Sequence, residues 1–142
     1  MDCRLSVVRV FVRDWPRALR FYTETLGIPL ALRNDDLGWA QLATGQAQLA
    51  LERLGPESGE NALTGRFLGV SLAVTDVYAT YEQLFARGVD FLAPPERMSW
   101  GGVLAHFRDP DGNVLTLVGP PRTPWPGPRR RAGEARPSSS PA

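Results

Sequence analysis

The sequence contains no lysine, one cysteine and one histidine among its 142 residues. The single cysteine, Cys3, cannot form an internal disulfide, and its place near the N-terminus favours a free thiol over a catalytic one. No apolar run approaches the roughly 18 residues that a membrane-spanning helix needs, and the first residues lack the basic-then-apolar pattern of an export signal. We therefore expect a cytoplasmic protein with no membrane partner.

The composition, with 43% hydrophobic and 22% charged residues, is that of one globular domain with a sizeable core. Residues 1–121 hold 11 arginines and 14 acidic residues, whereas residues 122–142 hold five arginines and one glutamate. The segment 121–142 is rich in Pro, Arg and Ser and offers little to bury, so we predict a domain over 1–120 and a disordered tail. Three adjacent tail arginines give only weak attraction to polyanions, and we expect no nucleic-acid partner.

The first half of the chain predicts a strand followed by a helix. Residues 5–14 alternate apolar and polar side chains, as a half-buried strand does. Asp14 suits a helix N-cap and Pro16 suits the first turn. Apolar residues then recur at helical spacing until Gly27.

The same order of signals returns in the second half, with a strand over 68–76, a cap at Asp76 and a helix closed by Gly88. Three short strand candidates follow each helix: 28–33, 37–43 and 46–53 in the first half, then 89–93, 101–108 and 113–118 in the second. Asp109–Gly112 is predicted as a tight turn. The sequence thus predicts an α+β fold with a βαβββ module over 5–53, a linker over 54–66 and a second module over 67–118.

The strand positions opposite the helix-facing stripes line whatever surface the two sheets enclose. In the first module these positions are Val7, Arg9, Phe11, Trp39, Gln41, Gln48, Ala50 and Glu52. In the second module they are Gly69, Ser71, Ala73, Leu104, His106, Val114, Thr116 and Val118.

The segments VVRVFVRDWPRALRFYTETLGIPL and WGGVLAHFRDPDGNVLTLV resemble the vicinal oxygen chelate superfamily of glyoxalases, bleomycin resistance proteins and extradiol dioxygenases. The resemblance covers residues 5–118. It implies that the two βαβββ modules form a curved, open, barrel-like mixed sheet around a cavity with the helices outside. It also implies a homodimer.

Metal-dependent members of that superfamily place four ligands at positions that fall here on Val7, Ala50, Gly69 and Thr116. Three of these side chains have no donor atom, and a threonine hydroxyl alone cannot hold a divalent ion. We therefore expect no metal at the inherited site. The alternative is a divalent metal at a non-standard site built from His106 and Glu52, completed by Gln41, Gln48 or water.

Two charged or titratable residues are candidates for polar contacts in the pocket. Arg9 lies between two valines and either pairs with Glu52 or grips an anionic group of a ligand. His106 either bonds a neighbour, contacts the ligand or transfers a proton, and it is the one weak candidate for catalysis.

Aromatic side chains set the expected class of ligand. Phe11 and Trp39 face the enclosed side, and the resemblance places Trp100 at the mouth of the cavity, so flat apolar molecules suit the pocket unless these rings are plain core. The predicted ligand-binding residues are Arg9, Phe11, Trp39, Gln41, Gln48, Glu52, Trp100, His106 and Thr116.

Three functions fit these observations. The first is metal-independent binding of a small aromatic or apolar molecule, as in the drug-sequestering bleomycin-resistance type. The second is a glyoxalase- or dioxygenase-like metalloenzyme with a rearranged site. The third is a regulatory or interaction module with a vestigial pocket. The sequence leaves open both the identity of the ligand and whether the protein is an enzyme.

Overall fold

The computed structural model of the chain describes residues 1–55 and 61–122, so most of the predicted tail lies outside the described residues. The first module contains β1 (Val7–Val12), α1 (Trp15–Arg20), a π-helical turn (Phe21–Thr25), β2 (Leu30–Asn34), β3 (Trp39–Leu42) and β4 (Gln48–Arg53). The second module follows a 3-10 turn (Asn61–Leu63) and contains β5 (Phe67–Ala73), α2 (Val77–Ala86), β6 (Asp90–Phe91), β7 (Glu96–Arg97), β8 (Val103–Arg108) and β9 (Val114–Gly119).

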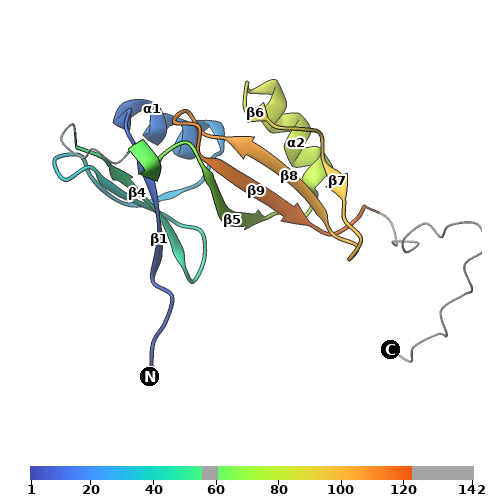
Figure 1. Cartoon of the computed structure of the whole chain (residues 1–142), viewed down its shortest axis with the longest axis horizontal. Helices are drawn as coiled ribbons and strands as arrows, with labels where there is room; N and C mark the ends of the chain where they lie inside the picture. The colour runs from blue at the N-terminus through green and yellow to red at the C-terminus, as the bar shows by residue number, and fades with distance from the viewer. Residues whose placement is uncertain (56–60, 123–142) are drawn as a thin grey trace, which may run out of the picture.

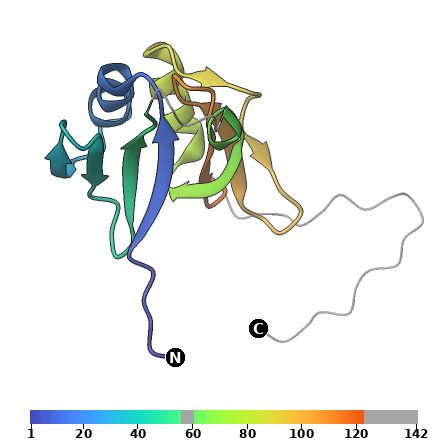
Figure 2. The same cartoon turned by 60° about the vertical axis from the view of Figure 1, so that its left-hand side comes forward.

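The two sheets have the same strand order, which confirms the predicted α+β fold built from a repeated unit. The first sheet runs β1-β4-β3-β2, and the second runs β5-β9-β8-β6 with β7 added on β8. In each sheet the first strand pairs in parallel with the last, and the other pairs are antiparallel. The sheets lie side by side as two hydrogen-bonded units without a closed barrel (Figures 1 and 2), and α1 and α2 lie on the same side of the molecule (Figure 1).

Two predicted elements differ in detail from the structure. The predicted helix changes to π-helical geometry after Arg20, where the Thr23 hydroxyl donates to the Leu19 carbonyl at 2.6 Å and competes with the regular backbone pattern. The strand predicted over 89–93 is reduced to β6, and the unpredicted β7 follows Pro94 and Pro95. Proline has no N–H to donate to a strand ladder, so these two prolines interrupt the edge of the sheet.

The helices begin at the predicted caps. The carboxylate of Asp14 accepts a hydrogen bond from the Arg17 backbone at 3.3 Å, and that of Asp76 accepts one from Ala79 at 3.1 Å. No helix among the described residues is long and apolar enough to cross a bilayer.

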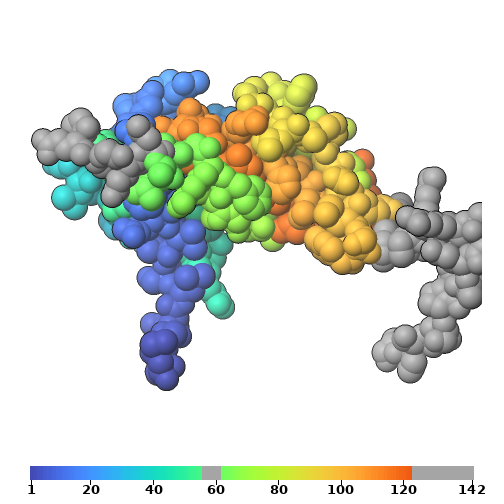
Figure 3. Space-filling model, in the orientation of Figure 1, coloured from blue at the N-terminus to red at the C-terminus, as the bar shows by residue number. Residues whose placement is uncertain are grey.

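One hydrophobic core joins the two modules. Val10 and Leu51 from the first sheet belong to the same buried cluster as Phe107 and Leu115 from the second. Phe21 reaches across the junction, with its ring centroid 6.4 Å from that of Phe107. The space-filling view shows one continuous body from which the first residues of the chain project (Figure 3).

A buried carboxylate at the module junction holds four hydrogen bonds. Asp109 is 5% exposed, and its Oδ2 accepts from the Tyr22 hydroxyl at 2.7 Å and from Asn113 Nδ2 at 2.9 Å. Its Oδ1 accepts from the backbone N–H groups of Asp111 and Asn113, both at 2.9 Å. Burial raises the pKa of the Asp109 carboxyl above its ordinary value. Burial also raises the pKa of the Tyr22 phenol well above its ordinary value, so Tyr22 remains a hydrogen-bond donor.

The predicted turn that contains Asp109 also bonds directly to the first module. Asn113 Nδ2 donates to the Phe11 carbonyl at 2.8 Å, and Asp111 Oδ1 accepts from the Arg13 backbone at 2.8 Å. Gly112 has φ +82°, which confirms the positive φ that the turn requires. This turn therefore fixes the end of β1 against the second module.

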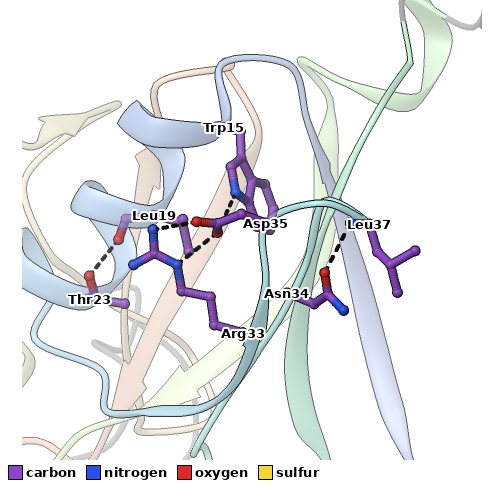
Figure 4. Close-up of polar contacts among 7 residues, drawn as sticks. All are labelled: Trp15, Leu19, Thr23, Arg33, Asn34, Asp35 and Leu37. Atoms are coloured by element: carbon purple, nitrogen blue, oxygen red, sulfur yellow. Dashed lines mark hydrogen bonds and ion pairs between the residues drawn. The ribbon is translucent and has the colours of Figure 1, made fainter.

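A second polar cluster ties the β2–β3 hairpin to the start of α1 (Figure 4). Asp35 accepts from Trp15 Nε1 at 3.1 Å and from two nitrogens of Arg33 at 2.7 and 2.9 Å. The hydrogen bond from the Arg33 guanidinium lowers the pKa of the Asp35 carboxyl most, and the hydrogen bond from the Trp15 indole makes the next largest contribution. Trp15 is 6% exposed, so its indole packs beside the helix cap.

We predict that Tyr22→Phe lowers the free energy of unfolding by about 1–3 kcal/mol, because it removes one donor from the buried Asp109 carboxylate while keeping the ring. Urea denaturation measures this change. The matched control is Tyr81→Phe, whose hydroxyl bonds no described residue and which should change stability by less than about 0.5 kcal/mol. Equal effects of the two substitutions would contradict the role of the Tyr22–Asp109 hydrogen bond.

Candidate functional site

The first sheet has a helix face, which belongs to the shared core, and an open face on the other side. The pairing register puts Phe11, Glu52 and Trp39 in one row across β1, β4 and β3, and Arg9, Ala50 and Gln41 in the next row. Val7 and Gln48 form a third row. The structure thus brings six of the nine predicted ligand-binding residues together: Arg9, Phe11, Trp39, Gln41, Gln48 and Glu52.

Hydrogen bonds fix the polar side chains along one edge of this open face. Trp39 Nε1 donates to Gln41 Oε1 at 3.1 Å, and Gln41 Nε2 donates to Gln48 Oε1 at 2.7 Å. Because both ends of the Gln41 amide are engaged, its orientation is set. Ala50 is fully buried beneath the larger side chains around it.

The other edge of the open face carries an ion pair beside an aromatic ring. Arg9 Nη1 lies 3.3 Å from Glu52 Oε2, so the pairing suggested by the sequence is formed. The Arg9 guanidinium carbon also lies 5.4 Å from the centroid of the Phe11 ring. The two charged side chains are 54% and 30% exposed, which leaves guanidinium N–H groups and carboxylate oxygen accessible to a ligand.

The corresponding face of the second sheet carries the predicted residues His106 and Thr116, of which Thr116 is buried at 3% exposure. His106 lies opposite Thr116, with Nδ1 and Oγ1 2.7 Å apart, and Ser71 lies beside Thr116 on β5. The Phe67 ring meets the His106 ring edge-on at a centroid distance of 5.5 Å. Since Nδ1 is engaged, Nε2 is the ring nitrogen of His106 left for other contacts.

Trp100 lies apart from both groups, in the loop between β7 and β8. Its side chain is largely exposed, and its ring covers the backbone of Gly102 so closely that a Cβ there would come within 1.8 Å of Trp100 Cζ3. The absence of a side chain at Gly102 therefore makes room for this indole, which the sequence could not reveal.

The four positions at which the resemblance places metal ligands do not fit an ion. Val7, Ala50 and Gly69 offer no donor atom, and the Thr116 hydroxyl is already bonded to His106. His106 and Glu52 stand on different sheets, and no group of three or more His, Cys, Asp or Glu side chains gathers among the described residues.

A cavity of about 750 Å³ lies between the modules, and it is lined by four of the positions predicted to face an enclosed surface: Gln48, Gly69, Ser71 and Ala73. An apolar stripe along β5 and just after it, Val70, Leu72 and Val74, also lines this cavity together with Leu26 and Ile28 of the first module. The stripe is only half-buried because α2 packs over β8 and β9 and leaves the edge strand β5 uncovered. The alternation in the sequence indicates the apolar stripe on β5. It does not indicate which strands α2 covers.

A family model described as the glyoxalase/bleomycin resistance protein/dioxygenase superfamily matches residues 4–117. A bleomycin resistance protein from Klebsiella pneumoniae is 30% identical over 113 residues, covering 75% of this chain and 84% of its own length. A probable lactoylglutathione lyase from Synechocystis is 30% identical over 122 residues, covering 75% and 88%.

Solved structures show the same fold. A superfamily member from Sphaerobacter thermophilus is 34% identical with a TM-score of 0.71, covering 83% of this chain and 98% of its own. TnmS3, an antibiotic-binding protein from Streptomyces, is 31% identical with a TM-score of 0.69, covering 84% and 98%.

We predict that Arg9→Gln lowers the free energy of unfolding by less than about 1 kcal/mol, because exposed ion pairs contribute little to stability. Urea denaturation of Arg9→Gln, Glu52→Gln and the double variant measures the coupling between the two side chains. If either single variant lowered the free energy of unfolding by more than about 2 kcal/mol, the Arg9–Glu52 pair would be a structural ion pair. That result would contradict the idea that the two side chains are available to a ligand.

Proposed function

Because the chain belongs to the glyoxalase/bleomycin resistance protein/dioxygenase superfamily, we propose that it binds a small organic molecule with a flat aromatic part, without a metal ion and as a homodimer. The open faces of the two sheets are the proposed binding surface. We place this activity in the cytoplasm.

The observation that carries the proposal is the composition of the open face of the first sheet. Phe11 and Trp39 supply ring surfaces in one row, with Glu52 between them and Arg9 and Gln41 in the next row. Apolar surface with a few fixed polar groups is typical of small-molecule sites. A flat ring system would lie against the two aromatic side chains, and its polar substituents would reach Arg9, Glu52 or Gln41.

Enclosure of such a ligand requires a second surface. The exposure of Arg9 and Glu52 means that the described part of the chain does not cover the open face of the first sheet. The strands β1 and β5 are edge strands of their sheets, and the half-buried apolar stripe of β5 borders the cavity between the modules. A second copy of the chain placed along these edges would bring an open second sheet over an open first sheet and enclose the ligand.

Two relatives support this class of ligand. TnmS3 is described as an antibiotic-binding protein, and the relative from Klebsiella pneumoniae is a bleomycin resistance protein. Sequestration of this kind needs affinity and no catalytic group. The residues Val7, Ala50 and Gly69 at the inherited ligand positions support a metal-free site.

We predict that at least one member of a panel of aromatic antibiotics that includes bleomycin binds in a saturable manner, and that Trp39→Ala weakens its binding at least tenfold. Isothermal titration calorimetry measures both affinities. The control is Phe85→Ala, which removes a more exposed ring from α2, away from the open faces, and should leave the affinity within twofold. No binding by any compound of the panel would instead favour an interaction module with a vestigial pocket.

We predict that dialysis against EDTA leaves the affinity for that ligand within twofold, because three of the four inherited ligand positions lack donor atoms. Elemental analysis of the purified protein accompanies the titration. Retention of about one divalent ion per chain, together with loss of binding or of an enzymatic activity on chelation, would establish the metalloenzyme alternative built around His106.

A further inference from the structure

The helix side of the molecule contains a cleft of about 460 Å³ at the junction of the two modules. Its walls come from α1, the π-helical turn, the end of α2, β6 and the β8–β9 turn. None of the nine predicted ligand-binding residues lines it, so it is separate from the open faces.

Four arginines line this cleft: Arg17, Arg20, Arg87 and Arg108. They come from both modules, although the first 121 residues hold more acidic than basic side chains. The arginine side chains in one cleft repel one another, and a bound anion would offset this repulsion.

The two aspartates in the cleft offset only part of this charge. Asp90 accepts from Arg108 Nη1 at 3.2 Å, and the Asp109 carboxylate is turned into the junction, where Tyr22 and Asn113 occupy it. The lining therefore carries an excess of two positive charges.

Two of the arginines have no ion-pair partner among the described residues that would explain their position. Arg17 and Arg20 are exposed, and neither forms an ion pair with a residue in the described ranges 1–55 and 61–122. They do not cap a helix end either, because the helical run continues from Arg20 through Thr25. Arg87 uses one N–H to bond the Thr25 carbonyl at 2.9 Å, which holds its guanidinium at the cleft with its other donors available.

We propose that this cleft binds a small phosphate-bearing anion. Guanidinium groups match the oxygens of phosphate with paired N–H donors, and several of them around one cleft suit a multiply charged group better than a single carboxylate. The volume lies within the range of small-molecule sites. Because the lining comes from α1 on one side and from α2 and β8 on the other, the bound anion bridges the two modules.

The test is isothermal titration calorimetry of the full chain with inorganic pyrophosphate at low ionic strength. We expect saturable binding of one pyrophosphate per chain, weakened at least tenfold by the double substitution Arg17→Gln and Arg20→Gln. The charge-matched control is Arg4→Gln with Arg66→Gln, two exposed arginines outside the cleft, which should leave the affinity within twofold. Circular dichroism checks that both double variants are folded.

Parallel titrations with AMP and citrate identify the anion. Tighter binding of AMP than of pyrophosphate points to a nucleotide, and the reverse order points to a free phosphate compound. Citrate binding as tight as pyrophosphate would overturn the assignment to phosphate. Absence of saturable binding, more than one pyrophosphate per chain, or equal losses in the two double variants would overturn the site itself, whatever ligand the open faces bind.

Discussion

Strands β1, β3, β4, β8 and β9 each commit one side to the shared hydrophobic core, and this constraint determines what the other side presents. On β1, Val10 is buried with the helices, so Arg9 and Phe11 must point to the open face. A shift of one residue in the register would exchange these sets and bury a charge in the core. The core thus selects the register, and the register groups the aromatic and polar side chains of the proposed ligand site.

The junction between the modules fixes how the two open faces are placed. Asp109 fills all its hydrogen-bonding directions with donors from both modules, and Asn113 reaches the backbone of β1. The bonds that Asp109 accepts from Tyr22 and Asn113 are buried, so breaking one leaves a polar group without a partner, which costs more than losing an exposed contact. The same turn borders the arginine-lined cleft, so an anion bound there would meet the junction at its outer side.

Much of the fold could be predicted because it follows from local signals: alternation in the strands, aspartate caps and a turn with glycine at a positive φ. The same alternation predicted the open face around Arg9 and Trp39. It could not predict which strand α2 covers, how Trp100 packs on Gly102, or that Asp109 is buried, because these depend on contacts between distant segments. The arginine-lined cleft also escaped sequence analysis, since Arg17 and Arg87 belong to different modules and meet only in the folded chain.

The most direct test of the proposed ligand site is the indole ¹H–¹⁵N spectrum of the isotope-labelled protein during titration with the tightest-binding aromatic compound. We expect a saturable shift of the Trp39 indole signal, whose N–H lies on the open face beside Gln41, while the signal of the buried Trp15 stays in place. A compound that binds tightly and leaves the Trp39 signal unmoved would contradict the placement of the ligand on the open face of the first sheet.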